Sequence, residues 1–265
     1  MKIFNPATTA LLANVTEDDV NTITQKYLSL QQGQPAWQQE KLTDKLLRIK
    51  KFRQLLLTNI DMLALTLSQE VGKPLTQARN EIHGAVTRVD YFLAQAQQVI
   101  GDDLVHQSEE VSEILSYEPL GIIANISAWN YPYLVGVNVF IPALLCGNAV
   151  LYKPSEFATL TGQHIADLLH QAGIPTNVFS LVCGDGKVGE QLLALDLDGY
   201  FFTGSYQTGQ YIAQRVSDKL VPVGLELGGK DPLYVTDEAN LTIAAQGVVD
   251  GAFYNNGQSC CAVER

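Results

Sequence analysis

Residues 120–152 read LGIIANISAWNYPYLVGVNVFIPALLCGNAVLY and contain no charged side chain. The run is long enough to cross a bilayer as one helix, but Asn125, Asn130, Pro132 and Pro142 interrupt it. Prolines and amides at these places suit a buried strand, a turn, a helix and a second strand better than one membrane helix. The stretch therefore predicts the first strand, the first helix and the second strand of an α/β sheet.

The same order of strand, turn and helix continues toward the C-terminus. Strands are expected at 122–126, 149–152, 178–182, 200–202, 221–225 and 233–235, with helices at 134–145, 160–171, 188–195 and 207–216. Strands that alternate with helices of about ten residues form βαβ units. We expect a Rossmann-like, mostly parallel sheet with helices on both faces, and ligands at the carboxyl ends of its strands.

An N-terminal helical segment precedes this sheet. Apolar residues recur at helical spacing, and breaks such as Gly72-Lys73-Pro74 separate the helices. Helices are expected at about 16–29, 36–57, 61–71 and 76–99. From 111 to 117 the pattern alternates, which is typical of a strand.

Composition excludes several classes of partner. The net charge of −11 leaves no excess of Lys or Arg for nucleic acid or for an anionic membrane surface. The four cysteines are scattered, without the paired spacing of a metal site, so we expect no metal and free thiols in a reducing compartment. The N-terminus shows no apolar signal segment, and we expect a cytoplasmic protein.

Two reactive side chains lie on turns near the end of the sequence. Cys260 follows a polar, flexible turn, 256–259, and Glu226 lies in an apolar run bounded by glycines. A thiol with a nearby carboxylate suits covalent catalysis with a water-activating base, and partial burial would make the Glu226 carboxylate a usable base near neutral pH. The alternatives are a buried inert thiol and a glutamate paired with Lys230.

Three further turns follow predicted strands. Asn130 offers an amide donor for an oxyanion, or belongs to a packed turn with Trp129 as a core residue. Lys153 and Glu156 could bracket a ribose, or form a solvated charged turn. Ser205 could help to bind an anion at a helix N-terminus, or act as an ordinary N-cap.

The segment 184–189 matches G-x-G-x-x-G between a strand and a helix, as in dinucleotide-binding loops. The acidic residue expected about 20 residues further on is absent, because the next strand ends in Phe202-Thr203-Gly204-Ser205. A tight turn that requires glycine is the favoured interpretation, and a pyrophosphate site is the alternative.

Taken together and in order, these motifs resemble the NAD(P)-dependent aldehyde dehydrogenase superfamily over essentially the whole chain. The matching segments are Trp129-Asn130-Tyr131-Pro132, Lys153-Pro154-Ser155-Glu156, Phe202-Thr203-Gly204-Ser205, Glu226-Leu227-Gly228-Gly229-Lys230 and Gly257-Gln258-Ser259-Cys260. One departure is Ala128, which stands where the family usually has proline.

The resemblance implies oxidation of a small-molecule aldehyde to a carboxylic acid. Cys260 would attack the aldehyde as thiolate, and the Asn130 amide and the Cys260 N–H would hold the oxyanion. Hydride transfer would leave a thioester, which water activated by Glu226 would hydrolyse. Cys261 is a bystander in this scheme.

The resemblance also implies the cofactor and its contacts. The residues expected to bind it are Trp129, Lys153, Glu156, Gly204, Ser205, Leu227 and Gly228. A glutamate at 156 would accept hydrogen bonds from the ribose hydroxyls and repel a 2′-phosphate. NAD is therefore expected in preference to NADP.

On this basis the chain divides into four parts. Residues 1–100 are the helical part of the cofactor-binding domain, 101–118 a protruding oligomerisation hairpin, 119–230 the Rossmann-like domain, and 231–265 the start of the catalytic domain. Family members are nearly twice as long, so most of the catalytic domain is expected to be missing, and the full-length form is expected to be a homo-oligomer. The alternative function is a truncated, catalytically incompetent NAD-binding or assembly module.

Overall fold

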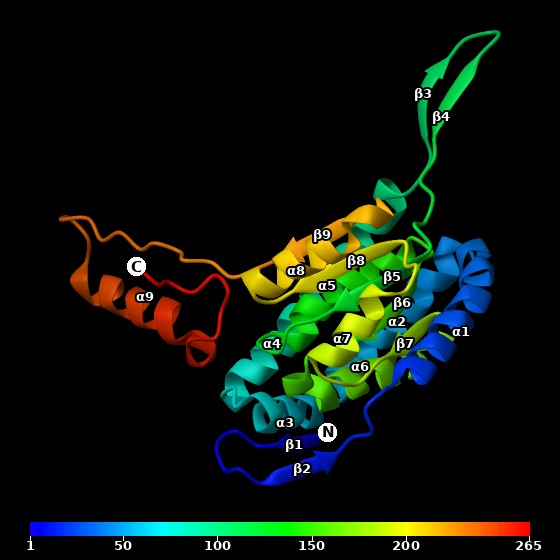
Figure 1. The fold of residues 1–265 in the computed structure, drawn as a ribbon. Helices are drawn as coiled ribbons and strands as arrows, with labels where there is room; N and C mark the ends of the chain where they lie inside the picture. Colours follow the sequence, from blue (N-terminus) through cyan, green and yellow to red (C-terminus); the bar gives the residue numbers. More distant parts are fainter.

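A five-stranded parallel sheet forms the centre of the computed structural model, which describes residues 1–265 (Figure 1). Its strand order is β7-β6-β5-β8-β9, so the chain starts in the middle, adds two strands on one side and then two on the other. The strands are β5 (Ile122–Ile126), β6 (Ala149–Lys153), β7 (Phe179–Leu181), β8 (Gly199–Thr203) and β9 (Val223–Glu226). The expected Rossmann-like α/β fold is confirmed.

Alternate residues of the central strands belong to different cores. Ile122 and Ala124 of β5 pack into a cluster with the apolar faces of α1, α7 and α8, whereas Ile123 packs with α2 to α6. Every residue of β5 and β6 is buried. A strand buried on both faces needs a continuous apolar run, which explains the charge-free stretch.

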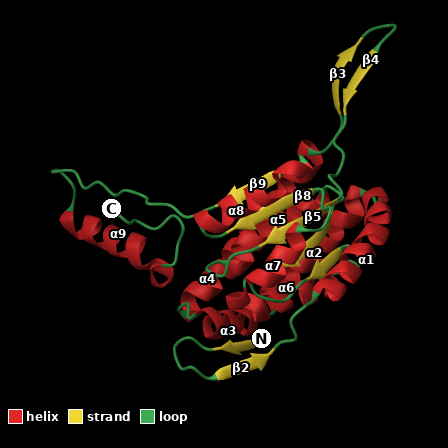
Figure 2. Ribbon diagram, in the orientation of Figure 1, coloured by secondary structure: helices red, strands yellow, loops and turns green.

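Helices cover both faces of the sheet (Figure 2). Those before it are α1 (Val20–Gln39), α2 (Leu42–Thr58), α3 (Ile60–Val71) and α4 (Leu75–Val99). Those between and after its strands are α5 (Pro132–Leu145), α6 (Thr159–Gln171), α7 (Gly186–Leu193), α8 (Tyr206–Val216) and α9 (Leu241–Phe253), with short 3-10 turns η1 (Glu156–Ala158), η2 (Ser217–Lys219) and η3 (Tyr254–Gly257).

The first helix differs from the sequence prediction. It begins after Asp19, whose carboxylate accepts from the Thr22 N–H at 2.8 Å, and it continues through Pro35 rather than ending near residue 29. Beyond Pro35, the buried Trp37 donates from its indole N–H to the Leu144 carbonyl at 3.0 Å. This tertiary contact outweighs the hydrogen bond that a proline inside a helix removes.

Two antiparallel hairpins lie outside the sheet. The pair β1 (Lys2–Phe4) and β2 (Leu11–Asn14) has no counterpart in the sequence prediction. The pair β3 (Asp103–Gln107) and β4 (Ser112–Leu115) projects far from the body, and all of its residues are exposed (Figure 1).

Residues 231–265 lie beside the body and carry α9 apart from the sheet (Figure 1). The predicted strand at 233–235 is wrong: this segment is irregular, and its neighbourhood forms only an isolated bridge between Asp231 and Val263. An apolar run becomes a strand only where a partner strand is available, and Tyr234 is 88% exposed. No residue of α9 is buried.

None of the helices combines the length and the apolar character that crossing a membrane would require.

Candidate active site

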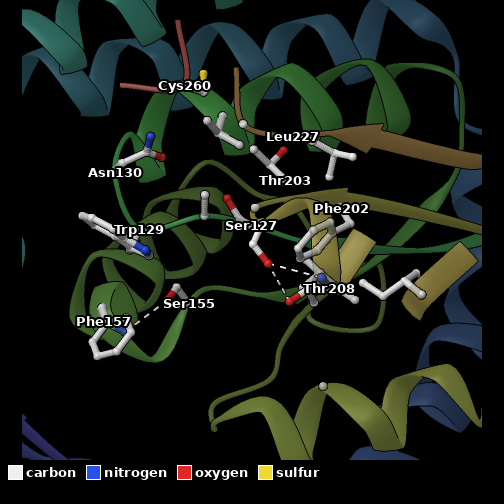
Figure 3. A pocket seen from close by; sticks show the side chains of 18 of the residues that line it. Ser127, Trp129, Asn130, Ser155, Phe157, Phe202, Thr203, Thr208, Leu227 and Cys260 are labelled. Carbon is white, nitrogen blue, oxygen red and sulfur yellow. Dashed lines mark hydrogen bonds between the residues drawn. The ribbon is translucent and has the colours of Figure 1, made fainter. Parts of the chain in front are cut away.

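A cleft of about 670 Å³ opens at the carboxyl ends of the parallel strands. The turns after β5, β6, β8 and β9, the start of α7 and the loop around Cys260 line it together (Figure 3). Every residue predicted for the site lines this cleft except Glu226: Cys260, Asn130, Trp129, Lys153, Glu156, Gly204, Ser205, Leu227 and Gly228. The fold therefore gathers side chains that are more than a hundred residues apart in the sequence.

Asn130 connects the turn after β5 to the loop that carries the cysteine. Its side-chain nitrogen donates to the Gln258 carbonyl at 2.8 Å, and its side-chain oxygen accepts from the Tyr131 N–H at 3.1 Å. A primary amide has two N–H donors, so one N–H of Asn130 is left without a protein acceptor. Two residues after Gln258, Cys260 lies near Asn130 at the rim of the cleft (Figure 3).

A buried ion pair packs against the turn that carries Asn130 and stabilises it. Lys73 and Glu81 form a salt bridge with neither side chain exposed, and Glu81 also accepts from the Tyr133 N–H at 2.8 Å, at the start of α5. The Lys73 ammonium lies 4.0 Å from the centre of the Tyr131 ring. Burial raises the pKa of Glu81 and lowers that of Lys73, while their mutual attraction opposes both shifts.

The Cys260 thiol is exposed, which excludes the alternative of a buried inert cysteine. Desolvation, followed by the neighbouring Cys261, raises the pKa of Cys260 above its ordinary value of 9.0. Gly229 lies against the Cys260 backbone, because a Cβ added there would meet the Cys260 carbonyl oxygen at 2.8 Å. Gly229 thus brings the segment after β9 against the loop that carries Cys260.

Glu226 occupies the last position of β9, and its side chain is exposed and outside the cleft lining. The expectation of a partly buried carboxylate is wrong, because β9 is an edge strand whose far side is uncovered. The alternative pairing is also wrong, since Lys230 forms its salt bridge with Glu264. The backbone carbonyl of Glu226 accepts from the Gly204 N–H at 2.9 Å, which ties together the turns after β8 and β9.

The turn after β6 presents one buried and one accessible charge. Lys153 is buried, which lowers its pKa, and it donates to the Pro154 carbonyl at 3.2 Å. A solvated charged turn is thereby excluded for Lys153. Glu156 is half-buried and accepts from the Ser155 hydroxyl at 3.2 Å. Its neighbour Phe157 packs edge-on against Trp129, with ring centres 6.5 Å apart.

Ser205 is the N-cap of α8, as in the simpler of its two interpretations. Its hydroxyl oxygen accepts from the Thr208 N–H at 3.2 Å. It also lines the cleft, so the first turn of α8 faces the ligand space. A side chain at Gly204 would require the Phe202 ring to move, because an added Cβ would lie 2.4 Å from that ring.

The glycine-rich segment after β7 forms the tight turn that was the favoured interpretation. Gly184 has a φ of 154°, and an added Cβ would lie 2.3 Å from Val188, so the tight turn requires glycine there. Gly186 and Gly189, in contrast, line the cleft at the start of α7.

Other cleft residues were not singled out from the sequence. Ser127 has a buried hydroxyl without a protein partner, and Phe157 and Thr203 also line the cleft. Their positions directly after β5, β6 and β8 were the available signal. The structure contains no group of three or more His, Cys, Asp or Glu side chains that could hold a metal ion.

Comparison with known proteins agrees with this architecture. The model of the Aldehyde dehydrogenase family matches residues 1–265, and the chain belongs to this family. It is 33% identical to the 3,6-anhydro-alpha-L-galactose dehydrogenase of Streptomyces coelicolor, over 100% of this chain and 54% of that protein. The chain thus spans about half the length of the curated relatives it matches.

Solved structures agree with the fold over the same half. An E. coli enzyme described as NADP dependent superposes with a TM-score of 0.95 at 28% identity, covering 100% of this chain and 55% of that one. An NAD-dependent aldehyde dehydrogenase from Sinorhizobium meliloti gives 0.93 at 30% identity, covering 99% and 53%. Relatives described with either cofactor therefore share this architecture.

Proposed function

We propose that the chain contributes the cofactor-binding part and the nucleophile of an enzyme that oxidises an aldehyde to a carboxylic acid, with NAD as hydride acceptor. The observation that carries this proposal is the shared cleft: the Cys260 loop and the strand-end turns line one space. A nucleophile at one end and a nucleotide-sized groove beside it suit a reaction between a covalently held substrate and a bound cofactor.

The groove has the chemistry that a dinucleotide needs. The first turn of α8 offers backbone N–H groups and a favourable dipole to a phosphate. Glu156, which lines the groove, offers a carboxylate to ribose hydroxyls. Gly186 and Gly228 leave open space where a side chain would stand, so a ligand can approach the backbone. When bound, NAD would supply the hydride acceptor.

The residues of the chain would then divide the remaining work. Cys260 attacks the aldehyde carbon as thiolate, and the resulting oxyanion is held by the unused Asn130 N–H and by the Cys260 N–H. Once hydride has left, the substrate is a thioester on Cys260. Glu226 is proposed to accept a proton from the water that hydrolyses it. Glu226 is the exposed last residue of the edge strand β9 and directly precedes Leu227, which lines the cleft.

The direct test mixes the 265-residue chain with NAD and a small aliphatic aldehyde such as propanal, and follows NADH by absorbance. A calorimetric titration with NAD accompanies it. Rising NADH absorbance is the expected result. Failure to bind NAD and to form NADH would contradict the proposal for this chain.

A second candidate function is an NAD-binding or assembly module that lacks turnover by itself. The uncovered apolar side chains of residues 231–265 favour it: Leu241, Ile243 and Phe253 are 76%, 67% and 71% exposed. Such side chains are expected to be covered in a larger assembly. Binding of NAD without NADH formation would select this candidate.

Glu156 provides a test of cofactor choice. We expect the chain to bind NAD more tightly than NADP, because the Glu156 carboxylate would repel a 2′-phosphate. Glu156→Gln removes the charge and should raise the affinity for NADP relative to NAD by about tenfold. Calorimetric titrations of both cofactors measure this ratio.

The matched control for this substitution is Glu190→Gln. Glu190 is another carboxylate of the cleft wall, but it lies on α7 and already pairs with Arg215. The ratio should stay within about twofold in this variant. An equal change in both variants would mean that overall charge, rather than Glu156, decides the preference.

A further inference from the structure

The loop that precedes Cys260 has an unfavourable backbone. Asn255, Asn256 and Gly257 all have left-handed conformations, with φ of 55°, 57° and 73°. A residue other than glycine adopts this conformation at a cost, and two in succession must be held by their surroundings. Since Cys260 follows three residues later, whatever holds these residues also places the thiol.

Helix α4 and the turn before it hold this loop through hydrogen bonds. The Asn255 N–H donates to the Gln77 side-chain oxygen at 2.7 Å, and the Asn256 side chain donates to the Gly72 carbonyl at 2.8 Å. Asn80 also donates to the Tyr254 hydroxyl, at 3.3 Å. These contacts join segments more than 170 residues apart in the sequence.

Asn255 continues this connection to Asn130. Its side-chain nitrogen donates to the Asn130 backbone carbonyl at 2.9 Å and to the Gln258 carbonyl at 3.5 Å. The Gln258 carbonyl also accepts from the Asn130 side chain at 2.8 Å. Two amides therefore meet on one carbonyl, two residues before the thiol.

Asn255 is fully buried, does not line the cleft, and has no partner for its side-chain oxygen. Only its donor nitrogen is used, so its contribution is to fix geometry rather than to touch substrate. An ordinary core position would be filled by an apolar side chain, because a buried polar atom without a partner is unfavourable.

We propose that Asn255, held by Gln77, is a positioning residue that fixes the Cys260 loop against Asn130. We call the hydrogen bonds of Asn255 to Gln77, Asn130 and Gln258 the clamp. The catalytic consequence of the clamp rests on the proposed function above, whereas the clamp itself does not. Loss of the clamp should separate the thiol from the amide that is proposed to hold the oxyanion, while the nucleotide groove is unchanged.

The test compares Asn255→Gly with Asn256→Gly in the 265-residue chain. Glycine accepts the left-handed conformation at both positions, so the pair isolates the side chains. Hydrogen exchange measured by mass spectrometry on peptides covering 254–262 should be about tenfold faster in Asn255→Gly and at most about threefold faster in Asn256→Gly, because the exposed Asn256 side chain makes a single contact to Gly72 whereas the buried Asn255 side chain joins two segments. Equal exchange in the two variants would overturn the clamp.

A second pair covers the case in which Asn255→Gly does not fold. Gln77→Ala removes the acceptor of the Asn255 N–H, whereas Gln77→Glu keeps an oxygen at that place. Faster exchange in the alanine variant, with parental exchange in the glutamate variant, supports the clamp. Parental exchange in both variants contradicts it.

The catalytic readout separates positioning from general stability. In Asn255→Gly, kcat for NADH formation should fall by about ten- to a hundredfold while the KM for NAD stays within about twofold. An unchanged kcat would overturn the positioning role. If the parent chain forms no NADH, the proposed function fails for this chain, and the exchange measurements still decide the clamp.

Discussion

Replacing Cys260 by alanine is expected to lower the rate of NADH formation by about a thousandfold or more. The substitution removes the only atom proposed to bond to the substrate, and Cys260 is the only cysteine that lines the cleft (Figure 3). The measurement is the NADH absorbance assay, together with NAD titration to show that the groove still binds. Retained turnover would contradict the nucleophile assignment.

Cys261→Ala is the matched control, because it removes the neighbouring exposed thiol and leaves Cys260 in place. Its rate should stay within about threefold of the parent.

The pKa of Cys260 is raised, so its thiolate is scarce near neutral pH, and alkylation of Cys260 by iodoacetamide should become faster as pH rises toward and above 9.0. A flat profile would mean that another group lowers the pKa.

Replacing Lys73 by methionine is expected to lower the free energy of unfolding by about 3–5 kcal/mol. Methionine fills similar volume, but it leaves the fully buried Glu81 carboxylate without its counter-charge. Glu81 also accepts hydrogen bonds at the start of α5, so the turn that carries Asn130 should loosen at the same time. Urea denaturation followed by circular dichroism measures the change.

Two controls separate the buried charge from the loss of a lysine. Arg79→Met breaks the salt bridge between Arg79 on α4 and Asp61 on α3, whose side chains are both exposed, and should cost less than about 1 kcal/mol. The double variant Lys73→Met with Glu81→Gln should recover part of the lost stability, since it removes the orphaned charge. A loss for Lys73→Met no larger than that for Arg79→Met would show that the buried pair contributes little.

The sheet could be predicted because its central strands are buried on both faces. Such strands need continuous apolar runs, and the runs at β5 and β6 are readable without any tertiary information. The position of the cleft followed from the same pattern, since the turns after parallel strands meet at one edge. Trp129, Lys153, Glu156 and Ser205 could therefore be assigned to one region.

The remaining features depend on contacts that a linear pattern does not contain. Helix α1 continues past Pro35 because Trp37 finds a partner on α5. Glu226 is exposed because nothing covers the outer side of β9, although its apolar neighbours suggested burial. The role proposed for Asn255 required the distant Gln77 and Asn130, which only the folded chain brings to it.

Because α9 lies apart from the sheet, different residues position the nucleotide groove and the cysteine. Two packed cores hold the strands whose ends form the nucleotide groove. The Cys260 thiol, in contrast, belongs to the segment 231–265, in which no residue of α9 is buried, and a few amide hydrogen bonds position its loop. Affinity for the cofactor and reactivity at the cysteine are therefore adjustable through different sets of residues. A substitution within residues 231–265 can change the reactivity of the cysteine without changing the nucleotide groove. A substitution in the two cores can change the groove while the surroundings of the thiol stay the same.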